Sequence, residues 1–314
     1  MTISGRGAPG APADLDDPAA VRLAAGELEA TFLPGRGMLG ASLRHRGEEL
    51  LRRVEDLAAA AAKGSTAGIP LLHPWANRLA GARYRAAGRD VMLDLSSPVL
   101  HLDGNRLPMH GVGWPLLAWE VLEADPERIA AQFDWNRSDL LAVFPYPHRL
   151  ELTVMLRSDS LTVETTLVAG GDGPVPVSFG FHPYFGIPGL PRSQWRLSLP
   201  AMRRLEADER GIPNGREGPA ETFDAALGET HFDDGFVVLE ERPAFSLEGA
   251  GRRITVEFLA GYRYAQIFAP RDKAYVAIEP MTAPTNALVS GRDLRLVNPG
   301  ERSRAAFGIT VQTQ

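Results

Sequence analysis

Two side chains able to exchange protons stand in stiff, apolar stretches of the sequence. His182 lies in GFHPYFGIPG (residues 180–189), between a phenylalanine and a proline, and is either filler in a turn or a group that the turn aims. Glu279 ends the apolar run VAIE and is followed directly by Pro280. A carboxylate at the end of a buried strand is costly unless it is paired or functional. Glu279 is therefore the best candidate for a general base, with a structural salt bridge as the alternative.

Four further polar side chains interrupt rigid sequence and could bind hydroxyl or carboxylate groups. They are Asn77 and Arg78 in GIPLLHPWANRLAG (68–81), His110 in LPMHGVGW (107–114) and Asp233 in THFDDGFVVL (230–239). A guanidinium group donates several hydrogen bonds in a fixed geometry. Glycine beside a histidine lets a ligand or another backbone come close. An exposed loop or an Asp-rich turn remains the alternative for each stretch taken alone.

The aromatic residues in these stretches suit a sugar, because the C–H faces of a pyranose stack on rings while its hydroxyls need polar partners. The residues in question are Trp75, Trp114, Tyr184 and Phe185. The sequence has no GxSxG, P-loop or GxGxxG motif, which argues against serine hydrolases, P-loop enzymes and dinucleotide enzymes. The seven histidines show neither HxH nor HExxH spacing, although isolated histidines could still converge on a metal as in a cupin.

Composition narrows the class of protein further. The 314 residues include no cysteine, so disulfides and thiolate chemistry are excluded, and the formal net charge of −6 argues against nucleic-acid binding. No apolar run is long enough to span a membrane, and the N-terminus lacks the apolar segment of a secretory signal. We expect a cytoplasmic protein. Residues 1–18 are rich in Gly, Pro, Ala and Asp and are expected to form a disordered or loosely packed tail, with one domain over 19–314.

The elements that must position these residues have mostly the pattern of strands. HRLELTVMLRS (148–158) and SLTVETTLVA (160–169) alternate apolar and polar residues across a short turn, which predicts a β-hairpin with one buried face. The clearest helical pattern is GEELLRRVEDLAAAAAK (47–63), although its first part could finish a strand. Many short strands between Gly and Pro residues, with few helices, predict an all-β sandwich or barrel.

Together these stretches resemble the aldose 1-epimerase (mutarotase) family of the galactose-mutarotase-like superfamily. The resemblance rests on PWANRLAG, HGVGW, GFHPYF, FDDGFVVL and IEPMTAPTNAL, in this order, and covers the chain from about residue 20 to its end. It implies an all-β fold, a large antiparallel β-sandwich with few short helices and an open cleft. It also implies His182 as general acid and Glu279 as general base, with Arg78, His110 and Asp233 holding sugar hydroxyls and Asn77 assisting.

The chemistry implied by the resemblance needs no metal, nucleotide or redox cofactor. A base takes the proton of the C1 hydroxyl of a free aldohexose while an acid protonates the ring oxygen, and the opened ring recloses on its other face. Partial burial would raise the pKa of Glu279, and the Glu279 carboxylate would favour a protonated His182. The partner is then a small sugar, with no nucleic acid and no membrane, and the protein is expected to be a monomer or a weak homodimer.

Three alternatives stay open. A hexose-6-phosphate 1-epimerase of the same superfamily would need basic residues near the cleft, for which Arg83, Arg85 and Arg106 are candidates. A sugar-binding protein without activity could use the same fold, and a cupin-like metalloenzyme is the third. Asn286 stands where the family often has aspartate, and His73 also departs from the better-known galactose enzymes, which leaves the preferred sugar open.

Overall fold

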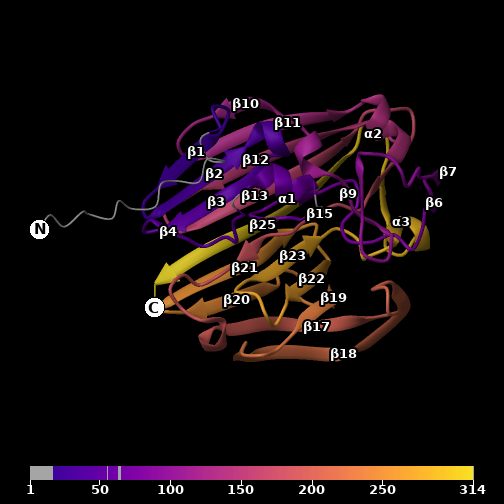
Figure 1. Ribbon diagram of the computed structural model, residues 1–314. Helices are drawn as coiled ribbons and strands as arrows, with labels where there is room; N and C mark the ends of the chain where they lie inside the picture. Colours follow the sequence, from indigo (N-terminus) through magenta and orange to yellow (C-terminus); the bar gives the residue numbers. More distant parts are fainter. Residues whose placement is uncertain (1–16, 55, 63–64, 314) are drawn as a thin grey trace, which may run out of the picture.

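Antiparallel strands dominate the computed structural model of the protein (Figure 1). The structure describes residues 17–54, 56–62 and 65–313. Residues 1–16 of the expected N-terminal tail lie outside the described residues. None of the helices that the structure describes is long and apolar enough to cross a membrane.

One large sheet of fifteen strands runs through the described part of the chain, and neighbouring strands in it are antiparallel. In order across the sheet the strands are β10 (Glu120–Ala124), β11 (Arg128–Trp135), β12 (His148–Leu156), β13 (Ser160–Ala169), β25 (Arg302–Thr313), β21 (Arg252–Ala260), β20 (Ala244–Gly249), β17 (Arg196–Ala207), β19 (Phe232–Val238), β22 (Tyr264–Ala269), β23 (Val276–Met281), β15 (Gly180–Phe181) and β5 (Leu71–Leu72), with β16 (Tyr184–Phe185) beside β23 and β18 (Pro213–Ala226) beside β17. The C-terminal strand β25 joins two halves of the molecule. Figure 1 shows β10–β13 on one side of β25 and β17–β23 on the other.

Smaller sheets and short helices complete the fold. The smaller sheets are β1 (Val21–Ala25), β2 (Leu28–Leu33), β3 (Leu39–His45) and β4 (Glu48–Glu49) together, then β14 (Val175–Val177) with β24 (Arg295–Val297), β6 (Arg83–Ala86) with β7 (Arg89–Met92), and β8 (Leu100–Leu102) with β9 (Pro108–Val112). The helices among the described residues are α1 (Leu57–Ala62), α2 (Ser138–Val143) and α3 (Ala287–Ser290), with 3-10 turns η2 (Pro34–Arg36), η3 (Trp114–Leu116) and η4 (Arg192–Gln194). The prediction of a large antiparallel β-sandwich with few short helices is confirmed.

The hairpin predicted from alternating residues is present as β12 and β13. The two strands pair in antiparallel register from His148 opposite Ala169 to Leu156 opposite Leu161. The apolar residues of β12, from Leu150 to Leu156 at every second position, are buried, while Glu151 and its polar neighbours are partly exposed. Period-two alternation therefore identified the buried face correctly.

The helix predicted over 47–63 is wrong for its first part. Residues 48 and 49 form β4, and Leu51 makes an isolated β-bridge with Phe185. The carboxylate of Glu49 accepts hydrogen bonds from the Leu43 and Leu51 backbone N–H groups at 3.0 and 3.1 Å. Among the described residues of this stretch, only Leu57–Ala62 is helical. The local hairpin of β4 with β3 and the bridge from Leu51 to Phe185 outweighed the helix propensity of the segment before it.

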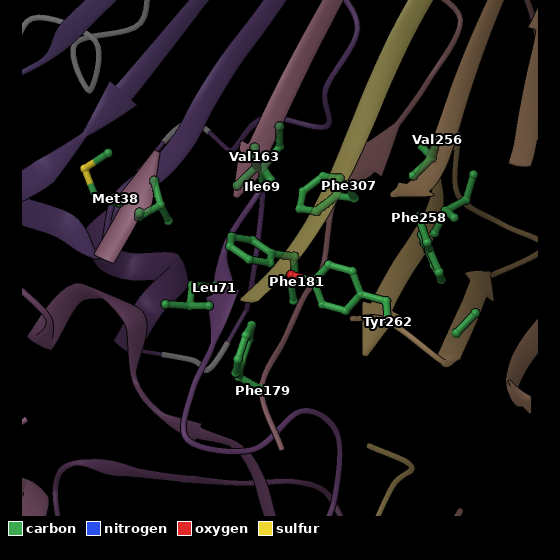
Figure 2. Close-up of a cluster of buried hydrophobic side chains, with 14 of the residues drawn as sticks. Met38, Ile69, Leu71, Val163, Phe179, Phe181, Val256, Phe258, Tyr262 and Phe307 are labelled. Carbon is green, nitrogen blue, oxygen red and sulfur yellow. The ribbon is translucent and has the colours of Figure 1, made fainter. Parts of the chain in front are cut away.

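The main apolar core includes buried side chains of β13, β25 and β21, and it also includes Phe181 and Phe185 on either side of His182. Figure 2 shows Phe181 and Phe307 facing each other, and their ring centroids are 5.2 Å apart. Tyr262 also packs against Phe307, with ring centroids 6.1 Å apart. The chain on either side of His182 is thus anchored in the core, which fixes the position of that histidine.

Candidate active site

Strand register places His182 directly across from Glu279. β15 and β16 both pair with β23, with Gly180 opposite Met281 and Tyr184 opposite Ala277. His182 lies midway between the two pairings, and in antiparallel register its opposite number is Glu279. Pro183 biases His182 towards an extended backbone, which keeps the chain between β15 and β16 extended alongside β23.

The two side chains meet at hydrogen-bonding distance inside the protein. His182 Nε2 lies 3.1 Å from Glu279 Oε1, and the two residues are 5% and 1% exposed. The hydroxyl of Tyr184 is also 3.1 Å from His182 Nε2, and the Tyr184 ring stacks on the imidazole with centroids 4.2 Å apart. Tyr184 is itself bonded to the hydroxyl of Thr66 at 2.5 Å. The HPYF motif therefore supplies both the histidine and the ring that orients it.

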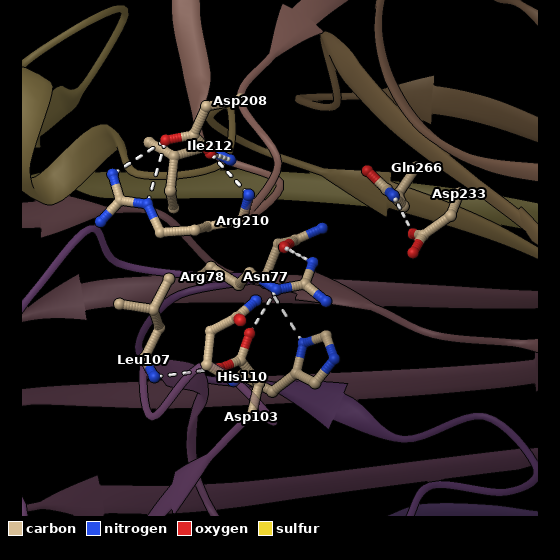
Figure 3. Close-up of polar contacts among 11 residues, drawn as sticks. Asn77, Arg78, Asp103, Leu107, His110, Asp208, Arg210, Ile212, Asp233 and Gln266 are labelled. Atoms are coloured by element: carbon tan, nitrogen blue, oxygen red, sulfur yellow. Dashed lines mark hydrogen bonds and ion pairs between the residues drawn. The ribbon is translucent and has the colours of Figure 1, made fainter.

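The neighbouring strands bring two more polar groups to the same face of the sheet. Gln266 of β22 is the cross-strand partner of Glu279, and Gly235 of β19 is the partner of Gln266. Asp233 stands two residues before Gly235, so its side chain points to the same face. The Gln266 side-chain amide donates to Asp233 Oδ1 at 2.8 Å, as Figure 3 shows. Sequence reasoning missed Gln266, whose only signal was its place in a strand.

Asn77, Arg78 and His110 arrive on an irregular segment that follows β5 and on β9 (Figure 3). The Asn77 backbone N–H donates to His110 Nδ1 at 3.2 Å, and the His110 backbone N–H donates to the Asn77 backbone carbonyl at 2.9 Å. Arg78 Nε donates to Asp103 Oδ2 at 2.7 Å, and Nη1 donates to the Asn77 side-chain carbonyl at 3.1 Å. Because Nδ1 of His110 accepts a hydrogen bond, a neutral His110 carries its proton on Nε2.

Two residues that the sequence singled out support this segment rather than facing a ligand. Gly111 has φ of 67°, and a Cβ there would lie 2.3 Å from the His73 carbonyl oxygen, so glycine permits the close approach of another backbone. Asn286 donates its backbone N–H to the Arg78 carbonyl at 2.9 Å and accepts from the Ala80 N–H at 2.8 Å. Asn286 thus holds the backbone on both sides of Leu79 and is not among the residues that line the cavity.

A cavity of about 250 Å³ lies where these strands and segments meet. All six residues expected from the sequence line it: Asn77, Arg78, His110, His182, Asp233 and Glu279. Sequence reasoning missed further lining residues, namely Arg52, Ser65, Thr66, Met109, Gln266, Phe268 and Tyr275. The Arg52 guanidinium lies 5.2 Å from the ring centroid of Tyr184 and 4.9 Å from that of Tyr275.

The aromatic residues expected beside a sugar divide between cavity and core. Tyr184 lines the cavity. Trp75 and Phe185 are fully buried in the main core, and Trp114 lines an apolar cavity of about 40 Å³ that shares Thr66, Met109 and His110 with the cavity of about 250 Å³. The expectation was wrong for Trp75 and Phe185, because apolar sequence next to a polar residue does not show which side of the backbone faces the cavity. Trp114 lies beside the cavity but does not line it.

Burial shapes the protonation of the site. Burial, with a smaller effect of nearby Asp233, raises the pKa of Glu279 well above its ordinary value of 4.5, as expected. Burial and then His110 lower the pKa of His182 well below its ordinary value of 6.5, which opposes the effect expected from the Glu279 carboxylate. Burial and Arg78 lower the pKa of His110 to about 3. His182 Nδ1 and Glu279 Oε2 have no hydrogen-bond partner among the described residues.

The other histidines and arginines considered from the sequence do not line this cavity. His73 packs against His148, with Nε2 atoms 2.9 Å apart, and both rings are buried. The phosphate candidates Arg83, Arg85 and Arg106 are exposed and lie outside the cavity lining. Within the part of the chain that the structure describes, no group of three or more His, Asp or Glu side chains is arranged to hold a metal ion.

The model of the aldose 1-epimerase family matches residues 39–310 of this chain. The chain belongs to the aldose 1-epimerase family. Among curated proteins it is 25% identical to the Escherichia coli uncharacterized protein YihR, in an alignment that covers 93% of each chain. It is also 28% identical to the E. coli aldose 1-epimerase over 143 residues, which cover 45% of this chain and 39% of that enzyme.

Solved structures have the same fold as this chain. A galactose mutarotase-like protein from Clostridium acetobutylicum superposes with a TM-score of 0.80, at 21% identity, over 93% of this chain and 95% of its own. That likeness concerns the fold. Each of the five stretches that carried the resemblance in the sequence contributes at least one residue to the lining of the cavity.

Proposed function

We propose that the protein is an aldose 1-epimerase that interconverts the α and β anomers of a free aldohexose. The observation that carries this proposal is the contact of 3.1 Å between His182 Nε2 and Glu279 Oε1 at the wall of a cavity of about 250 Å³. The reaction needs one group that accepts a proton from the C1 hydroxyl and one that donates a proton to the ring oxygen. A buried carboxyl–imidazole pair supplies both.

Ring opening depends on which of Glu279 and His182 holds the proton that lies between them. The neutral pair and the ion pair of Glu279 and His182 differ only in which of the two side chains holds one proton. Burial favours the neutral pair in the free protein, and a C1 hydroxyl donating to Glu279 would favour the carboxylate, with the proton on His182. The carboxylate then takes the C1 hydroxyl proton, the C1 carbonyl forms, the bond from C1 to the ring oxygen breaks, and His182 protonates that oxygen.

Ring closure reverses the roles after rotation about the C1–C2 bond. The C5 hydroxyl formed by opening returns its proton to His182 as its oxygen attacks C1 from the other face, and Glu279 returns its proton to the carbonyl oxygen. The protein recovers its starting protonation in each cycle, so no external acid, base or oxidant is consumed. Arg78, His110, Asp233 and Asn77 are assigned to the remaining hydroxyls, where the His110 Nε2–H and the Arg78 guanidinium donate and the Asp233 carboxylate accepts.

The arginines that the sequence offered for a 6-phosphate lie outside the cavity lining, which favours a free sugar. Arg85 is exposed and pairs with Asp90 at 3.1 Å, and neither Arg83 nor Arg106 reaches the cavity lining. The arginines that do line the cavity are already engaged, because Arg52 donates to the Thr66 carbonyl and Arg78 pairs with Asp103. The experiment is polarimetry of freshly dissolved α-glucose and α-galactose, alongside glucose 6-phosphate and galactose 6-phosphate, with and without the protein. Accelerated change of rotation for the free sugars supports the proposal. Acceleration for the phosphates alone would assign the alternative, and binding of hexose by calorimetry without acceleration of any sugar would indicate a binding protein.

A further inference from the structure

Two buried histidines that the proposed chemistry does not use form a hydrogen-bonded pair. His73 and His148 are 1% and 3% exposed, and their Nε2 atoms lie 2.9 Å apart. His148 Nδ1 lies 2.6 Å from the Tyr146 backbone carbonyl, which can only accept a hydrogen bond, so Nδ1 carries the proton of a neutral His148. His148 Nε2 is therefore the acceptor, and His73 Nε2 the donor, of the bond between the two rings.

Aromatic side chains surround the pair. The His73 ring centroid lies 5.0 Å from that of Trp135 and 6.3 Å from those of Phe144 and Phe179. Burial, with a smaller effect of His148, lowers the pKa of His73 well below 6.5, and burial lowers the pKa of His148 to about 4, so both rings are neutral near neutral pH. His73 Nδ1 has no hydrogen-bond partner among the described residues. The bond to His148 is therefore the directional contact that holds the His73 ring in apolar surroundings.

The pair joins parts of the large sheet that lie far apart in its strand order. His148 begins β12, near one end of that order, and His73 directly follows β5, at the other end. β5 pairs with β15, and β15 pairs with β23, the strand that carries Glu279. The hydrogen bond therefore connects the site's end of the sheet to a distant strand.

The chain that leaves this anchor carries groups assigned to sugar hydroxyls. The His73 carbonyl accepts from the Val112 backbone N–H of β9 at 2.9 Å. Four residues further on, the Asn77 carbonyl accepts from the His110 backbone N–H of the same strand, also at 2.9 Å, and Arg78 follows directly. The segment from His73 to Arg78 and strand β9 are thus one connected unit, which we call the binding wall.

From this geometry we propose that His73 and His148 are positioning residues for sugar binding, because their hydrogen bond fixes the binding wall relative to the strands that place His182 and Glu279. This inference rests on the proposed function. The groups on the binding wall are assigned to hydroxyls that do not react, so a displaced wall weakens binding of the ground state and of the transition state alike. The expected signature is a raised KM with little change in kcat.

Three variants separate positioning from stability. His148→Leu removes the acceptor and leaves the His73 N–H buried without a partner, which is destabilising. His148→Gln keeps an oxygen that can accept from His73. The double variant His73→Leu/His148→Leu removes donor and acceptor together, so no N–H is left unpaired and most of the stability should return.

His45→Leu is the matched control. His45 is also buried, at 4% exposure, and accepts a hydrogen bond from Arg252 Nε at 3.1 Å, but it lies on β3, outside the binding wall and outside the cavity lining. Urea unfolding followed by tryptophan fluorescence compares the stability of the variants. Polarimetry of freshly dissolved α-glucose and α-galactose over a range of concentrations gives kcat and KM.

The expected result is a lower urea midpoint for both His148→Leu and His45→Leu, with KM raised by about tenfold in His148→Leu alone, the equivalent of about one hydrogen bond. The double variant should regain stability and keep the raised KM. His148→Gln should have a KM near that of wild type, and kcat should stay near wild type throughout.

A KM near the wild-type value in the double variant would overturn the inference, as would an equal rise of KM in His45→Leu, because the pair would then do no more than stabilise the fold. If His148→Leu does not fold, the double variant carries this comparison alone. Either of these outcomes leaves the proposed function standing. No acceleration of any sugar by wild type would contradict the proposed function itself, and this inference with it.

Discussion

Replacing Glu279 by glutamine tests the burial of this carboxyl group at nearly constant shape. The side chain is 1% exposed, and burial raises its pKa well above 4.5. Between that ordinary value and the raised pKa, the unfolded chain ionises the group while the folded protein keeps it protonated. The folded state then binds more protons than the unfolded state, so the free energy of unfolding falls as pH rises through this window.

The size of this change in the free energy of unfolding is set by a difference of one bound proton between the folded and the unfolded state. A full difference of one bound proton changes the free energy of unfolding by about 1.4 kcal/mol per pH unit. Glu279→Gln has no carboxyl group to ionise, so its free energy of unfolding relative to wild type should rise by about that amount per unit above roughly pH 5. The rise should stop at the pKa of Glu279 in the folded protein. Titrating groups that do not contact Glu279 cancel in the difference.

Urea unfolding followed by tryptophan fluorescence over a series of pH values measures this difference. Glu240→Gln is the matched control, because Glu240 is exposed and the difference from wild type should stay flat. A flat difference for Glu279→Gln as well would refute the reasoning, since it would mean that the folded protein ionises Glu279 as readily as the unfolded chain does.

Three further substitutions test the groups around the pair. Tyr184→Phe removes the hydroxyl 3.1 Å from His182 Nε2 and should lower kcat by about tenfold with little change in KM, measured by polarimetry over a range of pH. Arg78→Lys loses the fork that joins Asp103 and Asn77, and kcat/KM should fall by about 10- to 100-fold in the same assay. Gly111→Ala forces a Cβ to 2.3 Å from a carbonyl at positive φ and should cost about 2–5 kcal/mol in urea unfolding. Gly88→Ala, also at positive φ but in open space, should cost only about 1–2 kcal/mol.

The fold was predictable where a local pattern coincided with the final environment. The alternation in 148–158 and 160–169 became β12 and β13, because one face of this hairpin lies on the core. The pattern in 47–63 failed at its start, where residues 48 and 49 close a tight hairpin with β3 and residue 51 bridges to residue 185 in a distant part of the chain.

The site was predictable to the extent that its residues stood out from apolar sequence. His182 and Glu279 did so, and strand register brings them together. Arg52, Gln266 and Tyr275 did not, because an arginine after a strand, a polar residue within one and an aromatic before one are common features of any β protein. The cavity that they complete depends on pairing between strands far apart in the sequence, which local patterns do not encode.

The central claim is that Glu279 and His182 exchange the two protons of anomer interconversion. Polarimetry of freshly dissolved α-glucose and α-galactose with wild type, Glu279→Gln and His182→Asn tests it most directly. Wild type should accelerate the change of rotation, and each variant should lose about 100- to 10,000-fold in kcat while remaining folded by circular dichroism. A rate near that of wild type from either variant would contradict it.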